Sequence, residues 1–150
     1  MADDTSTQAP KDFMGFLEFY LVKKAPFQIP DEIREWLVKF GPWIAVVLLV
    51  LSAPLVLFAL GLGTAFLPIG GYGYATAFGT AAIGLLAHFA LMAFALPGLF
   101  ARKMVGWTLM FYAQIANAVA SILAGNVLTA LVGALISFYV MFQIRGKYKN

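Results

Sequence analysis

Two long stretches of the chain contain no aspartate, glutamate, lysine or arginine. The first runs from Gly41 to Ala101, and the second runs from Met104 to Ile144. Of the 150 residues, 62% are hydrophobic and only 11% are charged. A water-soluble domain of this size cannot cover so much apolar surface with so little charge. The pattern therefore predicts an all-α, polytopic membrane protein, and it excludes disorder and nucleic-acid binding.

Helix-breaking residues divide each uncharged stretch into two membrane spans. A helix needs about 20 apolar residues to cross the hydrocarbon of a bilayer. Glycines and a proline at 61–74 indicate one turn, and the dipeptide Gly125-Asn126 indicates another. The transmembrane domain is therefore expected over residues 43–144. Its four predicted spans are about 43–63, 75–100, 107–124 and 127–144.

The basic residues predict the orientation of these spans. Five of them precede the first span, Arg102 and Lys103 lie between the second and third, and three follow the fourth. With four spans, all ten fall on one side, which the positive-inside rule identifies as the cytoplasmic side. We therefore expect both termini in the cytoplasm, with residues 145–150 forming a basic tail.

The segment before the first span predicts a polar tail at 1–12 and two short amphipathic helices within 13–42. Apolar residues recur there at helical spacing, once after Asp12 and again after Pro30. Such helices either lie in the cytoplasmic membrane interface or dock a partner protein. Ten residues are expected to anchor the chain at the interface or to dock a partner, and the last two are tryptophans that begin spans. They are Phe13, Phe16, Leu17, Tyr20, Ile33, Trp36, Leu37, Phe40, Trp43 and Trp107.

Several kinds of chemistry are not expected from this composition. The chain has no cysteine and one histidine, so a disulfide framework and a cysteine- or histidine-rich metal site are excluded. No carboxylate, lysine or arginine is predicted inside the hydrocarbon, where proton-coupled pumps need an ionisable group. We therefore expect no catalytic residue, no metal site and no enzymatic activity.

A few neutral polar residues and one histidine are predicted at mid-membrane depth. Gln114, Asn117 and Ser121 share one face of the third span, at about the depth of His88 on the second span. They favour an interhelical hydrogen-bond network among the four side chains. One alternative is that His88 is an axial ligand of a haem or chlorophyll-type pigment, with space beside Gly84. The other is a water- or substrate-lined cavity at the same place.

Small residues on the predicted spans indicate close helix packing. Ala130, Gly133, Ala134 and Ser137 form such a face on the fourth span. Partners are therefore expected to be membrane lipids and other membrane-protein subunits, or a second copy of the chain.

Two segments of the sequence resemble a known kind of protein. These are Ala25-Pro26-Phe27-Gln28-Ile29-Pro30 with the following Glu35-Trp36-Leu37-Val38-Lys39 and Pro42-Trp43, and the ending from Tyr139 to Tyr148. They resemble small four-helix bacterial membrane proteins of unassigned function, over most of the chain. The resemblance implies a bacterial inner-membrane protein, and it implies no reaction.

Three hypotheses for function follow from these observations. The first is a non-enzymatic accessory, assembly or structural subunit of a larger membrane complex. The second is a pigment- or haem-binding subunit that uses His88. The third is a small oligomeric channel or neutral-solute carrier lined by the polar residues of the second and third spans.

Overall fold

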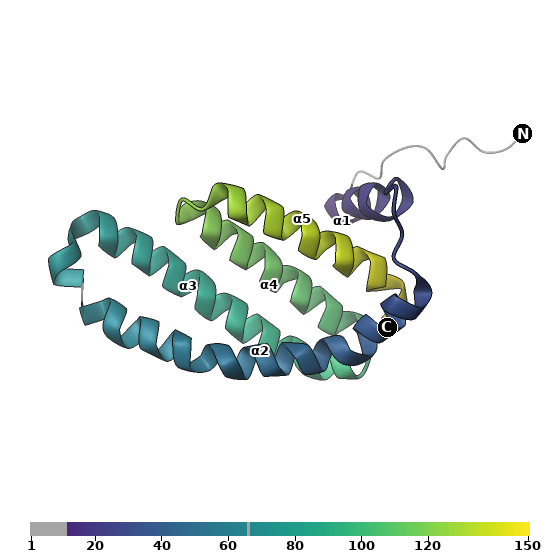
Figure 1. The fold of residues 1–150 in the computed structure, drawn as a ribbon, viewed down its shortest axis with the longest axis horizontal. Coiled ribbons are helices and arrows are strands. Elements are labelled where there is room, and N and C mark those ends of the chain that lie inside the picture. Colours follow the sequence, from purple (N-terminus) through teal and green to yellow (C-terminus); the bar gives the residue numbers. More distant parts are fainter. Residues whose placement is uncertain (1–11, 66) are drawn as a thin grey trace, which may run out of the picture.

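The computed structural model describes residues 12–65 and 67–150 of the chain (Figure 1). The elements in chain order are α1 (Phe13–Glu18), the π-helix η2 (Phe19–Lys23), α2 (Asp31–Ala65), α3 (Leu67–Phe100), α4 (Met104–Leu123), α5 (Val127–Ile144) and the 3-10 helix η3 (Arg145–Lys147). The fold is all-α, and four of the helices are long and apolar enough to cross a membrane. These findings confirm the predicted fold class and make the chain a multi-pass membrane protein. The predicted polar tail lies outside the described residues, except for Asp12.

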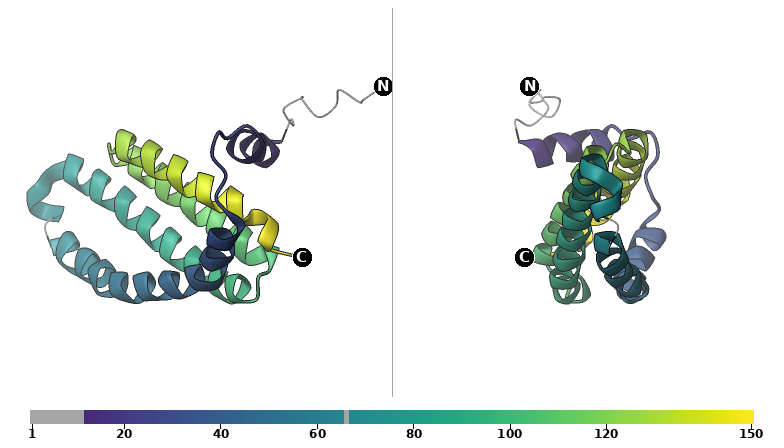
Figure 2. Two further views of the ribbon diagram at one scale, coloured as in Figure 1. Left: turned by 45° about the vertical axis from the view of Figure 1, so that its right-hand side comes forward. Right: turned by 90° about the vertical axis from the view of Figure 1, so that its left-hand side faces the viewer.

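The four long helices follow one another in space in the order in which they occur in the chain (Figure 1). Among the described residues, α3 and α4 make the most extensive contact of any two elements, and α2 packs on α3 while α5 packs on α4. The hairpin of α2 and α3 extends beyond the turn between α4 and α5, as Figure 1 and the left view of Figure 2 show. The outer faces of α2 and α5 are open to lipid or to other chains, except where η2 packs on α5.

α2 begins well before the first predicted span and passes through it without a break. It contains Pro42 and Pro54, and Pro42 is buried. Proline removes one main-chain hydrogen bond, which membrane helices tolerate where neighbouring groups compensate. The exposed side chains of Ile33, Trp36 and Phe40 continue along one side of this helix. The second predicted amphipathic helix is therefore the first part of the first span, and the prediction of two separate helices is wrong here.

Most of the turn predicted at 61–74 is helical. α2 continues to Ala65, α3 begins at Leu67, and the helical geometry is interrupted at Gly71, whose φ is 70°. Glycine adopts this left-handed conformation without the steric cost of a side chain. The other predicted turn is confirmed, because Gly125 has a φ of 88° between α4 and α5.

The buried core lies at the charged end of the helices, and Trp107 is at its centre. Trp107 is 0% exposed, its Nε1 donates a hydrogen bond to the Met141 carbonyl oxygen at 2.9 Å, and its ring stacks on that of Phe111. The prediction that Trp107 anchors the chain at the membrane interface or docks a partner is therefore wrong. The reason is position, because α4 packs between α3 and α5, whereas α2 with its exposed Trp43 is at the edge.

The N-terminal helix pair packs on the bundle with only part of its predicted apolar stripe. Leu17 and Leu21 contact the core, whereas Phe13, Phe16 and Tyr20 remain exposed. α1 continues into η2, and η2 contacts α5. One side of this segment is thus an internal packing surface, and the other side is available to lipid or a partner.

Candidate functional site

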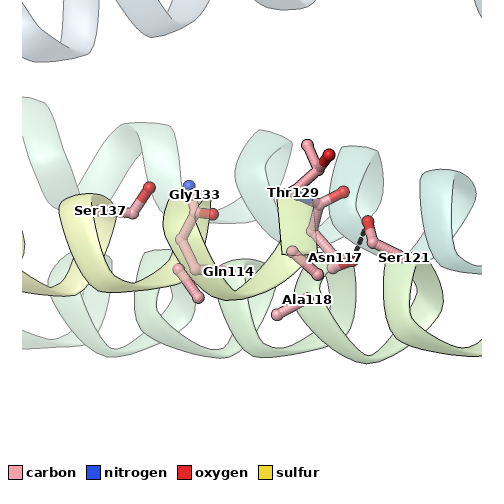
Figure 3. Close-up of a pocket in the computed structure, with 9 residues that line it drawn as sticks. Gln114, Asn117, Ala118, Ser121, Thr129, Gly133 and Ser137 are labelled. Atoms are coloured by element: carbon pink, nitrogen blue, oxygen red, sulfur yellow. Dashed lines mark hydrogen bonds between the residues drawn. The ribbon is translucent and has the colours of Figure 1, made fainter. Parts of the chain in front are cut away.

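A groove between α4 and α5 carries most of the polar side chains that the sequence predicts inside the membrane (Figure 3). Its volume is about 200 Å³. The residues that line it are Gln114, Asn117, Ala118, Ser121, Thr129, Ala130, Gly133, Ala134 and Ser137. The polar groups come from both helices, and the spaces between them are lined by alanine and glycine.

Helical spacing on each side produces this groove. Thr129, Gly133 and Ser137 recur every four residues on α5, so they form one face of that helix. On α4, Gln114 and Asn117 lie on the face that meets them, and Gln114 is about 15 Å along the helix from Met104 by the rise of 1.5 Å per residue. This position is near the middle of a span of about 30 Å.

The carboxamide groups of Gln114 and Asn117 make no hydrogen bond with any other described residue. Ser121 donates to the main-chain oxygen of Asn117 at 2.8 Å and does not bond to the Asn117 carboxamide (Figure 3). Asn117 is exposed and Gln114 is half-buried. Two amide groups, with both donors and acceptors, therefore open from α4 into the groove.

His88 does not join these side chains, so the predicted four-residue network is not assembled. Its Nδ1 lies 3.0 Å from the main-chain oxygen of Ala113 on α4. A carbonyl oxygen can only accept, so Nδ1 carries the proton, and Nε2 of the neutral ring does not. The side chain of His88 thus joins α3 to the main chain of α4 at Ala113. The next residue, Gln114, faces α5 instead.

Gly84 lies where α3 meets α4, at the edge of an apolar groove of about 460 Å³. A Cβ atom added to Gly84 would collide with the Cβ of Ala120 and would lie 3.4 Å from the Ala120 Cα. The side of Gly84 that faces α4 is therefore closed by Ala120, whereas the apolar groove beside this contact leaves the predicted space open.

Two lining residues were missed by the sequence reasoning. Thr129 and Ala118 were not singled out, although Gly133, Ala134 and Ser137 were recognised as a small-residue face. The recurrence of Thr129, Gly133 and Ser137 at intervals of four is a signal that could have identified Thr129. Ala118 carries no such signal, because alanine is common on every span.

A network of charges and amides covers the opposite, charged end of the bundle. Arg34 donates to Gln143 Oε1 at 2.7 Å, and Gln143 Nε2 donates to the Leu21 carbonyl oxygen at 3.0 Å. Ion pairs join Arg102 to Glu35 at 2.6 Å and join Arg145 to Glu18. This network ties the N-terminal segment, the α3–α4 turn and the end of α5 together.

Tyr148 belongs to the same end of the molecule. Its ring is 5% exposed and packs into the core cluster. Burial raises the pKa of its hydroxyl above the ordinary value, and the nearby Arg102 charge partly opposes this shift. The buried ring therefore favours the neutral phenol.

The remaining residues predicted for anchoring or docking are distributed between surface and core. Ile33, Trp36, Phe40 and Trp43 are 41–62% exposed on α2. Leu37 is partly buried against the core, as Leu17 is. The exposed aromatic residues of α2 are placed at the same end as the charges, where an aromatic belt meets the lipid headgroups.

The groove contains neutral hydrogen-bonding groups and no titratable side chain. Over the described ranges 12–65 and 67–150, no three histidine, cysteine or acidic side chains gather in a way that could hold a metal ion. The chemistry that the groove supports is hydrogen bonding and close packing. Comparison of the chain with family models, with curated proteins and with solved structures gives no significant match.

Proposed function

We propose that this protein is a non-enzymatic structural subunit of a membrane complex, and that its α4–α5 groove receives a membrane-spanning helix of a second chain. The observation that carries the proposal is the pair of unpartnered carboxamides, Gln114 and Asn117, at mid-membrane depth. The second chain is either another protein or a second copy of this one, and both belong to the same binding mode.

Unpaired polar groups are costly in the hydrocarbon of a bilayer. An amide without a hydrogen-bond partner costs several kcal/mol there, since lipid tails offer neither donors nor acceptors. A partner helix that presents polar side chains satisfies both carboxamides. The glycine and alanine residues of α5 allow its main chain to approach closely, which is how membrane helices associate.

Cysteine cross-linking tests this proposal with little background, because the natural chain has no cysteine. We expect Ser137→Cys in the groove to cross-link to a second membrane chain in intact membranes, with the partner identified by mass spectrometry. A matched cysteine at Val119, which is 49% exposed outside the groove, should give little product. Equal cross-linking at the two positions would argue against a specific groove partner.

Removal of the carboxamides tests the same groove differently. Gln114→Leu with Asn117→Leu should weaken the free energy of association by roughly 1–2 kcal/mol for each lost interhelical hydrogen bond. Thr76→Val alters an exposed hydroxyl far from the groove and serves as the control. A complex that survives the double leucine change, in a protein that remains folded, would exclude this mode of assembly.

We also propose that the protein resides in a bacterial inner membrane with both termini in the cytoplasm. The resemblance described above and the gathering of basic residues at one end of the bundle support this orientation. A reporter fused after Lys149 should then give a cytoplasmic readout, and one inserted at Gly125-Asn126 should give a periplasmic readout. The reverse pattern would overturn the orientation.

A second candidate function is the binding of a haem or chlorophyll-type pigment through His88. One observation favours it, namely that the bond from Nδ1 to Ala113 leaves Nε2 of the neutral ring without a proton and able to bind a metal. The gently purified protein should then show a pigment absorption band that His88→Ala removes. A spectrum without such a band excludes this candidate.

The channel or carrier hypothesis requires more than one copy. The groove is open along its side, so it would enclose a solute path only when other helices cover it. Solute flux into liposomes that contain the purified protein tests this hypothesis, and flux equal to that of empty liposomes excludes it.

A further inference from the structure

Lys103 and Lys149 lie side by side although they are far apart in the chain. They form an isolated parallel β-bridge, in which Met104 N donates to Lys149 O at 2.8 Å and Lys149 N donates to Arg102 O at 2.9 Å. Lys103 directly precedes α4, and Lys149 follows η3. The bridge uses only main-chain atoms, so it holds two ammonium-bearing side chains next to each other without using either of them.

Neither of these lysines has an acidic partner in the described part of the chain. Three neighbouring cations differ in this respect, because Arg102 pairs with Glu35, Arg145 pairs with Glu18, and Lys147 is near both Asp31 and Glu35. Lys103 and Lys149 are also both exposed. Two neighbouring positive charges repel each other unless an anion lies between them, so this pair offers a site for an anion from outside the chain.

An apolar groove begins beside the two lysines and follows α4. It has a volume of about 240 Å³ and is lined by Met104, Val105, Thr108, Leu109, Tyr112 and Asn150. Val105 is 65% exposed and Tyr112 is 50% exposed, and with Thr108 they recur at i, i+3 and i+7 on one helix face. This face is turned away from Gln114 and Asn117, since successive residues of a helix differ by about 100°. The groove therefore faces lipid and is separate from the α4–α5 groove.

We infer that this place binds an anionic phospholipid, with its phosphate between Lys103 and Lys149 and one acyl chain along the groove of α4. The two lysines precede and adjoin the first turn of a membrane-spanning helix, which places them at the depth of lipid headgroups. The apolar side chains that follow lie where an acyl chain descends from its headgroup. Lysines close to a membrane surface attract anionic lipids in this manner. The inference does not depend on the proposed helix partner.

Native mass spectrometry of the full chain in detergent tests the inference, with phosphatidylglycerol and phosphatidylcholine of equal chain length as the two probes. We expect Lys103→Gln with Lys149→Gln to weaken phosphatidylglycerol binding by about 30-fold. Each lysine near the surface contributes a factor of roughly five, and the two factors multiply. Phosphatidylcholine binding should not change. The matched control, Lys23→Gln with Lys24→Gln, removes two exposed charges from the same end and should weaken binding by less than about threefold.

Two further variants separate this site from a general charge effect. Lys103→Arg with Lys149→Arg keeps both charges and should retain binding, which also guards against a misfolded glutamine variant. Thr108→Trp fills the groove without a change in charge and should weaken binding of the intact lipid. Glycerol phosphate, a headgroup without acyl chains, should not displace the lipid at equal concentration. The inference is overturned if the two glutamine pairs behave alike, if Thr108→Trp binds normally, or if glycerol phosphate competes.

Discussion

The main chains of Gly98 and Gly106 are in direct contact where α3 turns into α4. A Cβ atom added to Gly98 would lie 2.6 Å from the Gly106 nitrogen and 2.7 Å from the Gly106 Cα. A Cβ added to Gly106 would collide with the main chain of Gly98 and Leu99. Both positions therefore require glycine because of space, and the contact fixes how closely the two central helices approach.

The first prediction concerns this contact. Gly106→Ala should lower the free energy of unfolding by about 3 kcal/mol, because the clash is with main chain that cannot rotate away. Gly79→Ala is the control in α3, where nothing lies within 4 Å, and better helix propensity should leave stability equal or raised by up to about 1 kcal/mol. Unfolding by SDS in mixed micelles measures both, and similar stability of the two variants would contradict the contact.

The second prediction compares two tryptophans that occupy similar places in the sequence. Trp107→Phe should cost about 2 kcal/mol of stability, since it removes the bond to Met141 and leaves unfilled volume in the core. Trp43 is 62% exposed, so Trp43→Phe should change stability by less than about 0.5 kcal/mol. The same unfolding titration tests the pair, and a larger loss for Trp43→Phe would reverse the assignment of core and surface.

The third prediction concerns the buried Gln143, which is 4% exposed and links Arg34 to Leu21. Gln143→Leu should destabilise the docked N-terminal segment by about 2–4 kcal/mol, because the guanidinium loses its amide partner in a place where its Nε already has none. Trypsin should then cleave faster after Lys23 and Lys24. Gln28→Leu, which affects an exposed side chain, should leave the cleavage rate unchanged, and equal rates for the two variants would contradict the link.

The fourth prediction concerns alkaline pH and Tyr148. Burial raises the pKa of its hydroxyl in the folded protein, so the unfolded chain loses this proton at a lower pH than the folded chain does. The stability contributed by the neutral phenol is therefore complete below about pH 10 and decreases as the pH rises beyond that value. The free energy of unfolding of the natural protein should fall more steeply between pH 9 and pH 11 than that of Tyr148→Phe. Equal slopes would show that the ring does not titrate differently on folding.

The number of spans and the gathering of charge at one end could be predicted because both depend on composition along the chain. Lys103 and Arg145 fall next to span ends whatever the packing, so their positions mark boundaries. The environments of Trp43 and Trp107 could not be predicted in this way. Each lies within two residues of a glycine, near the start of an uncharged stretch, and only the neighbours of each helix decide that Trp43 faces out while Trp107 is enclosed.

The candidate site was also predicted in part. The common face of Gln114, Asn117 and Ser121 follows from helical spacing, and it is present. The partner of that face could not be predicted, because His88 and α5 were equally possible neighbours from depth alone. The rotation of α4 about its axis places the Ala113 main-chain oxygen toward His88, and it places the carboxamides of Gln114 and Asn117 toward α5. A rotation of this kind depends on close contacts such as that of Gly84 with Ala120, which involve residues distant in the sequence.

The bonds at the charged end also constrain the order in which the chain is completed during synthesis. Gln143 bonds to the N-terminal segment at Leu21, and Lys149 bonds to the α3–α4 turn at Arg102. Gln143 and Lys149 are therefore translated long after the segments to which they bond. The N-terminal segment must wait undocked while the ribosome adds α2 to α5, and its exposed aromatic side chains can rest on the membrane surface during that interval. Closure of the structure is thus a late event that follows insertion of the last membrane helix.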